Sequence, residues 1–169
     1  MSGKAFTRRQ SRRKAFELLF ELEQHPGLDA QSILSRTFEH PDVVLVYSTD
    51  EDEEGYVAGL FDAGSQLFVT ELVHAAKDHE PFLDAELAKY PHDWSYDRIG
   101  VPERVLLRLA VAEMIFLGTS HKVVIDEALD MAKLYAQDDA RRFINGILGA
   151  VMKNIDQLRN DAREGQPPE

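Results

Sequence analysis

The sequence predicts an all-α fold of about seven helices, on two observations. Apolar residues recur at helical spacing along most of the chain, and Pro or Gly residues interrupt that spacing at intervals that suit helix ends. Apolar residues make up 44% of the chain, which is enough for a buried core and too much for a disordered protein. With 169 residues, the chain fits one domain or two small lobes that share one core.

Each predicted helix has its own stripe of apolar residues. The first begins near Thr7 and ends before His25, because the Pro and Gly that follow cannot continue it. The fifth starts at Pro102 and is apolar nearly all round, so we expect it at the centre of the protein, ending at Gly118. The predicted ranges are 7–24, 29–38, 65–79, 81–90, 102–117, 120–135 and one long last helix from 138.

The stretch 40–63 is predicted to be an acidic connector of irregular structure. Val43 to Tyr47 has the composition of a strand, but a lone run of five has no partner that the sequence reveals. The acidic run 50–54 is typical of a solvated loop. We expect a single domain over 1–160, a turn carrying Trp94 over 91–100 and a flexible tail over 161–169.

The charge of the chain is unevenly distributed. Its formal net charge is −11, yet the first sixteen residues hold six cations and no acid, so the remaining residues carry −17. Such asymmetry between a short arm and a body indicates a segment that binds a polyanion. The six cations are Lys4, Arg8, Arg9, Arg12, Arg13 and Lys14.

The four arginines of the first helix are the main candidate site. Their spacing places them in a basic stripe over its first turns, and guanidinium groups match phosphate oxygens and stack on bases. Phe16 and Phe20 lie on the same helix and would suit base stacking, although core packing is the more favoured interpretation for them. For the arginines, polyanion binding is favoured over a merely solubilising role.

No catalytic constellation is visible in the sequence. Glu71 and His74 have the spacing of one metal-ligating helical motif, but a di-iron bundle needs two such motifs and two further glutamates, so we predict no metal and no cofactor. There is no cysteine, no Gly-rich phosphate loop and no nucleophile elbow. Neither a signal peptide nor a membrane span is expected, which favours a cytoplasmic protein.

Three segments resemble the NusB family of transcription antitermination factors. They are RRQSRRKAFELLFELE at 8–23, DWSYDRIGVPERVLLRLAVAEMIF at 93–116 and HKVVIDEALDMAKLYAQDDARRFINGILGAV at 121–151. The last segment is the most specific of the three. The resemblance implies two helical lobes and binding of the boxA element in ribosomal RNA leader transcripts, together with the small-subunit ribosomal protein NusE, in a complex with RNA polymerase. It leaves open whether the chain is a monomer or a homodimer.

The resemblance also implies roles for individual residues. Arg8, Arg9, Arg12 and Arg13 would meet RNA, and Phe20 stands where the family usually has tyrosine, so stacking is kept while a hydroxyl contact is lost. Further residues expected at the RNA are Lys122, Arg142 and Phe143. Glu103 and Arg108 are expected at or near the NusE interface, and Glu113 and Asn145 to be structural. Two other interpretations remain open: an enzyme built as a helical metal bundle, and a scaffold that binds only proteins.

Overall fold

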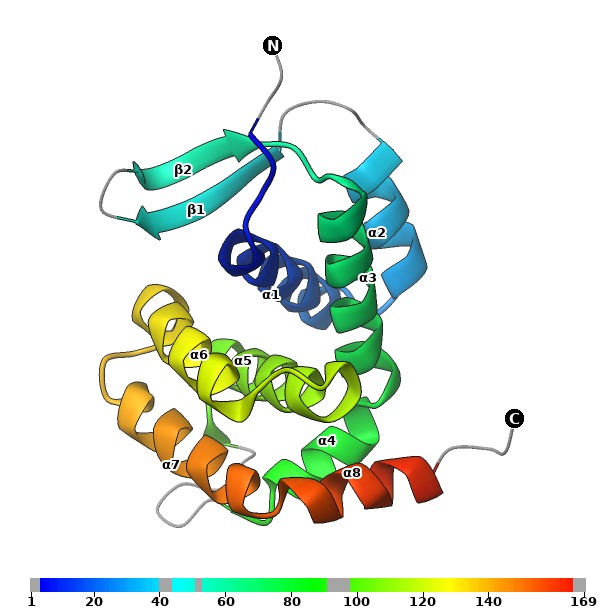
Figure 1. The fold of residues 1–169 in the computed structure, drawn as a ribbon, viewed down its shortest axis with the longest axis vertical. Helices are drawn as coiled ribbons and strands as arrows, with labels where there is room; N and C mark the ends of the chain where they lie inside the picture. The colour runs from blue at the N-terminus through cyan, green and yellow to red at the C-terminus, as the bar shows by residue number, and fades with distance from the viewer. Residues whose placement is uncertain (1–3, 40–43, 51–52, 91–97, 166–169) are drawn as a thin grey trace. The chain divides into compact units, whose positions relative to one another are not determined.

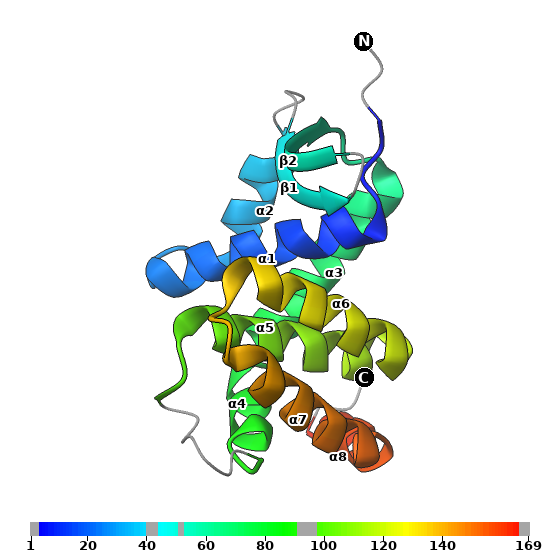
Figure 2. The same cartoon turned by 90° about the vertical axis from the view of Figure 1, so that its left-hand side faces the viewer.

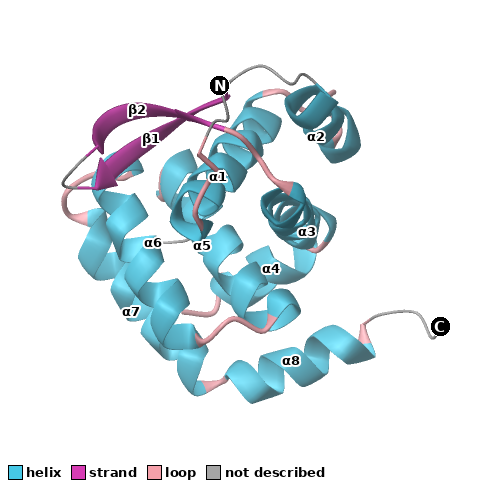
Figure 3. Cartoon of the chain, turned by 45° about the horizontal axis from the view of Figure 1, so that its top comes forward, coloured by secondary structure: helices cyan, strands magenta, loops and turns pink. Residues whose placement is uncertain are grey.

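The computed structural model describes residues 4–39, 44–50, 53–90 and 98–165. Contacts divide the chain into two compact units, residues 1–74 and 75–169. The described parts are mostly helical, as the colours of Figure 3 show. They contain eight α-helices, one short π-helix and two strands. The prediction of a largely helical fold in two lobes is therefore confirmed, and the hairpin is an addition to it.

Unit 1 is built from three helices and the hairpin (Figure 1). α1 (Arg8–Gln24) and α2 (Ala30–Glu39) lie close to their predicted ranges, and α3 (Ala63–Asp78) starts two residues earlier than expected and runs to the end of the unit and beyond. The strand next to α1 is β1 (Val44–Asp50), and β2 (Glu53–Gly59) pairs with β1 (Figure 2). Buried apolar residues of this unit include Phe6, Phe16, Leu19, Ile33, Val46 and Leu72.

The prediction of an irregular connector over 40–63 is wrong for its described residues. β1 and β2 form an antiparallel hairpin in which Val46 pairs with Val57 and Asp50 pairs with Glu53. Val46 is fully buried, which explains why an apolar run stands here. The partner strand escaped notice because it starts inside the acidic run and contains Gly55, whose φ is +107°.

The core of unit 2 surrounds α5 (Val101–Ala112), whose residues from Val105 to Ala112 are all buried, as predicted for a helix apolar nearly all round. α5 contacts α4 (Glu80–Leu87), α6 (His121–Tyr135) and α7 (Ala140–Lys153). It continues into a π-helical turn, η2 (Glu113–Leu117), which ends at Gly118 in the left-handed conformation. The predicted stop at this glycine is confirmed.

The predicted long last helix is interrupted. α7 ends at Lys153, and α8 (Ile155–Glu164) begins after Asn154, whose φ of −112° and ψ of 15° break the helix. The apolar stripe continues across the break, with Val151 and Leu158 both buried, so apolar spacing gave no sign of it. α8 also runs to Glu164, so the tail expected from 161 is helical there. Trp94 and the acidic residues 51–52 lie outside the described residues.

Candidate nucleic-acid interface

The start of α1 is fixed by hydrogen bonds on two sides. Thr7 caps the helix in a capping box: its hydroxyl accepts from the Gln10 backbone N–H at 3.2 Å, and the Gln10 side chain accepts from the Thr7 N–H at 2.9 Å. The preceding residues pair with the end of the hairpin, where the Phe6 N–H donates to the Leu60 carbonyl at 3.1 Å and the Leu60 N–H donates to the Lys4 carbonyl at 3.2 Å. The first arginines are thus presented from a defined backbone.

The four arginines of α1 differ in exposure. Arg8 is exposed and Arg9 half-buried, whereas Arg12 is 7% exposed and Arg13 is 0% exposed. The expectation of one open basic stripe is therefore wrong for Arg13, and Arg12 presents little surface. Spacing along a helix sets which residues share a face, but it does not reveal which face is covered. Of these four arginines, Arg8 and Arg9 are the more exposed.

An aromatic ring from α3 lies against two of these arginines. The Arg8 guanidinium carbon is 4.2 Å from the centroid of the Phe68 ring, and that of Arg12 is 5.4 Å from the same centroid. Both distances are within the range of cation–π attraction. Phe68 could not be recognised as a site residue from the sequence, because it belongs to the apolar stripe of its helix and carries no other sign of a role.

A carboxylate also lies near the exposed arginine. Asp62 precedes α3 and accepts a hydrogen bond of 2.7 Å from the Ser65 backbone N–H. This bond is the main reason why the pKa of the Asp62 carboxyl is lowered from its ordinary value, and the positive charge of Arg8 adds to the effect. The Ser65 hydroxyl donates to the Phe6 carbonyl at 3.1 Å, which links the start of α3 to the residues before α1.

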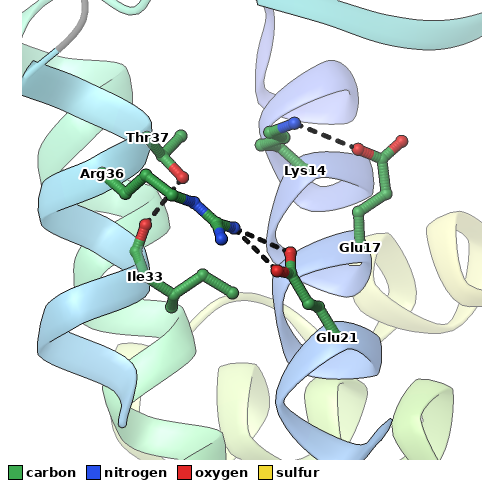
Figure 4. Close-up of polar contacts among 6 residues, drawn as sticks. All are labelled: Lys14, Glu17, Glu21, Ile33, Arg36 and Thr37. Atoms are coloured by element: carbon green, nitrogen blue, oxygen red, sulfur yellow. Dashed lines mark hydrogen bonds and ion pairs between the residues drawn. The ribbon is translucent and has the colours of Figure 1, made fainter. Parts of the chain in front are cut away.

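The acidic residues in the middle of α1 are engaged with other cations (Figure 4). Glu17 accepts a hydrogen bond of 3.3 Å from Lys14, and Arg36 of α2 donates to both carboxylate oxygens of Glu21 at 2.8 and 2.9 Å. Burial raises the pKa of Glu17, and the ion pair with Lys14 offsets part of that rise. The carboxylates of Glu17 and Glu21 therefore pair with cations other than the arginines at the start of the helix.

Phe20 lies further along α1 and is half-buried. Its ring stacks on Phe16, with centroids 6.1 Å apart and planes inclined by 27°. Phe16 is buried, which agrees with the core interpretation for that residue, while Phe20 keeps some accessible surface. A half-exposed ring supported by a buried one is suited to stacking on a base.

The candidates of unit 2 lie on two helices. Lys122 and Arg142 are exposed and Phe143 is half-buried. Lys122 is in the first turn of α6 and Arg142 in the first turn of α7, so the full length of α6, roughly 20 Å of helix, separates them along the chain. Arg142 and Phe143 are neighbours in the sequence at the start of α7, and a shared site with Lys122 stays a prediction.

Glu103 and Arg108 are both buried in unit 2, at 6% and 8% exposure. Glu103 accepts a hydrogen bond of 3.3 Å from the Gln137 backbone N–H, and Arg108 donates to Asp84 of α4 at 2.7 and 2.9 Å. Both side chains are thus engaged within unit 2, and their place at or near the NusE interface stays a prediction. Glu113 is also buried, as expected for a structural role, whereas Asn145 is exposed.

The Glu71–His74 motif is not part of a larger cluster of potential metal ligands among the described residues. Glu71 is exposed and His74 half-buried on α3. No group of three or more potential metal ligands occurs in the parts of the chain that the structure describes. Within the same residues, no helix has both the length and the apolar character needed to cross a membrane.

The fold and the charges together define a class: a small, mostly helical and acidic protein whose first helix begins with a cluster of arginines. Comparisons with known proteins identify the family. The model of the NusB family matches residues 9–153. The transcription antitermination protein NusB of Staphylococcus carnosus is 34% identical over 84% of this chain and 96% of its own length, and that of Nitratidesulfovibrio vulgaris is 31% identical over 93% and 94%. This chain belongs to the NusB family, as the sequence resemblance predicted.

Solved structures agree with this assignment. NusB from T. maritima aligns with a TM-score of 0.67 at 26% identity, covering 93% of both chains. A chain from a crystal structure of the antitermination factors NusB and NusE in complex with double-stranded RNA aligns with a TM-score of 0.65 at 27% identity, covering 86% of this chain and 96% of that one. The helical two-lobed fold is therefore that of the family.

Proposed function

We propose that this protein is a transcription antitermination factor that binds boxA-type RNA of ribosomal RNA leader transcripts together with the ribosomal protein NusE. The observation that carries the proposal is the fixed start of α1, where Arg8 is exposed and its guanidinium lies over the Phe68 ring in an otherwise acidic chain. The related solved complex that contains NusB, NusE and RNA supports both partners. In this proposal the protein is a cytoplasmic adaptor without catalysis, acting with RNA polymerase.

The proposed roles follow exposure. Arg8 and Arg9 donate to phosphate oxygens, because arginine N–H groups match them in bidentate geometry. Arg12 supports Arg8 from beside the same ring, and Phe20 stacks on a base. Arg13, which is fully buried, is a structural residue in this proposal. Unit 2 contributes Lys122, Arg142 and Phe143.

A titration with labelled boxA RNA tests the proposal. Arg8→Glu reverses one exposed charge, and we expect binding to weaken by at least about tenfold, with circular dichroism unchanged. Arg163→Glu makes the same charge change at an exposed position of α8, and we expect an effect below about threefold. Affinity should also fall with salt, log K decreasing by about 0.7 for each phosphate contacted. Equal effects of the two reversals would contradict the site.

Binding of NusE is best tested by adding the purified protein, and not by substituting residues of α5. Glu103→Lys would place a cation where a buried carboxylate accepts a hydrogen bond, so any loss of partner binding would be mixed with loss of stability. We expect purified NusE to bind the chain and to tighten its binding to boxA RNA more than to a scrambled RNA. Binding of NusE without any binding of RNA would favour the protein-only scaffold instead.

A further inference from the structure

Phe68 occupies a central place at the start of α1. It lies on α3 and is 7% exposed, and Arg8 and Arg12 both rest against its ring. The two arginines are one helical turn apart, about 6 Å along the axis, so one ring spans both. Two like charges at this spacing repel each other, and attraction to a common aromatic face opposes that repulsion.

The geometry points to Phe68 as a positioning residue for RNA recognition, a role that rests on the proposed function. The ring does not contact the RNA in this proposal; it holds the guanidinium of Arg8, with that of Arg12 beside it, before the RNA arrives. An aromatic face attracts a cation through its ring quadrupole and has no lone pair to accept a hydrogen bond, so the N–H donors of the guanidinium stay available to a phosphate. Phe68 therefore supplies order without consuming the donors of Arg8.

An arginine side chain that is ordered before RNA binds should raise the affinity for RNA. A long arginine side chain that is mobile in the free protein loses rotamer freedom when it binds a phosphate, and that loss weakens binding. An arginine already held against a ring has lost much of this freedom during folding. The backbone beneath is fixed as well, because the Ser65 hydroxyl of α3 donates to the carbonyl of Phe6, two residues before α1.

The first variant is Phe68→Leu, which keeps an apolar side chain and removes the aromatic face. We expect binding to boxA RNA to weaken by roughly tenfold, since two guanidinium–ring contacts are lost while all charges remain. Phe68→Tyr retains the ring and should restore affinity to within about twofold of the parent. Phe82→Leu removes one half-buried aromatic ring from α4 in the other unit, and should leave RNA binding unchanged.

A double-mutant cycle separates positioning from mere structural support. If Phe68 acts through the arginines, Phe68→Leu should weaken RNA binding in the parent and have no further effect in an Arg8→Ala, Arg12→Ala background. An equal loss in both backgrounds would overturn the inference, because the ring would then be acting on the fold as a whole. So would unchanged binding by Phe68→Leu in a protein whose affinity does depend on Arg8.

A second variant keeps the test decisive if Phe68→Leu folds poorly. Replacement of Phe68 by pentafluorophenylalanine conserves the shape of the ring and inverts the charge distribution of its face, which turns attraction for a cation into repulsion. We expect weaker RNA binding at unchanged thermal stability, and unchanged affinity would overturn the inference. Failure of the parent protein to bind RNA, or indifference of its affinity to Arg8→Glu, would instead remove the proposed function on which the inference rests.

Discussion

The ion pair between α4 and α5 offers a sharp test of how unit 2 is held together. Arg108 donates through Nε and Nη2 to the two carboxylate oxygens of Asp84, at 2.7 and 2.9 Å, and Glu80 lies 3.6 Å from the same guanidinium. The Arg108 side chain is 10% exposed and that of Asp84 is 32% exposed. Asp84→Asn keeps the shape of this contact and removes one of its charges.

The stability that Asp84→Asn removes can be estimated from these exposures. A hydrogen bond to a charged group contributes about 1.5–3 kcal/mol, and breaking a fully buried ion pair costs about 3–5 kcal/mol. Asp84 is partly hydrated, Glu80 remains, and asparagine can still accept one bond, so the lower end of the range applies: about 2 kcal/mol. For a chain of this size, that loss lowers the melting temperature by about 4–8 °C.

Urea unfolding followed by tryptophan fluorescence suits this measurement, because Trp94 is the single tryptophan and belongs to the sequence of unit 2. We expect the midpoint of Asp84→Asn to fall by about 1 M. The matched control is Lys89→Met, which removes an ion pair of 2.7 Å between Lys89, just after α4, and Glu86 of α4, at a lysine side chain that is 62% exposed. The urea midpoint of Lys89→Met should stay close to that of the parent, because exposed ion pairs contribute little to stability. An Asp84→Asn midpoint equal to that of the parent would refute the structural role of the pair.

Three further predictions concern single side chains. Gly146→Ala should raise the free energy of unfolding, measured in urea, by about 0.5–1 kcal/mol. This helical glycine is exposed, and an added methyl group would meet nothing within 4 Å. A lower free energy of unfolding would contradict this open environment. Burial raises the pKa of Glu17, so ionised Glu17 lowers the free energy of unfolding above that pKa, and the effect disappears below the ordinary carboxyl pKa. We therefore expect Glu17→Gln to be more stable relative to the parent at pH 7 than at pH 4. A stability difference that does not change with pH would contradict this prediction. Asp62→Asn keeps the acceptor for Ser65 but removes a negative charge near Arg8, so RNA should bind about twofold to fivefold more tightly at low salt, with the gain vanishing at high salt.

Most helices were predictable because their ends carry local signals. Thr7 caps α1, and α1 ends where a Pro and a Gly follow it; Gly118 adopts the left-handed conformation that ends η2. The hairpin was not predictable from local pattern, since its pairing joins an apolar strand to one that begins with two glutamates. The break at Asn154 was hidden for the opposite reason: the apolar stripe carries on from α7 into α8 as if the helix were continuous.

The candidate site shows what charge patterning leaves undetermined. Arg8 and Arg13 are the same residue type in the same cluster, and helical spacing places them on different sides of α1 without revealing which side is covered. The structure separates them, because Arg8 is exposed on the ring of Phe68 and Arg13 is fully buried. Removal of a buried charged group disturbs the fold, whereas removal of an exposed one alters what the surface attracts. Arg13→Met should therefore shift the urea midpoint, and Arg8→Met should leave that midpoint in place and weaken RNA binding. A reversal of these two outcomes would mean that RNA reaches the buried arginine.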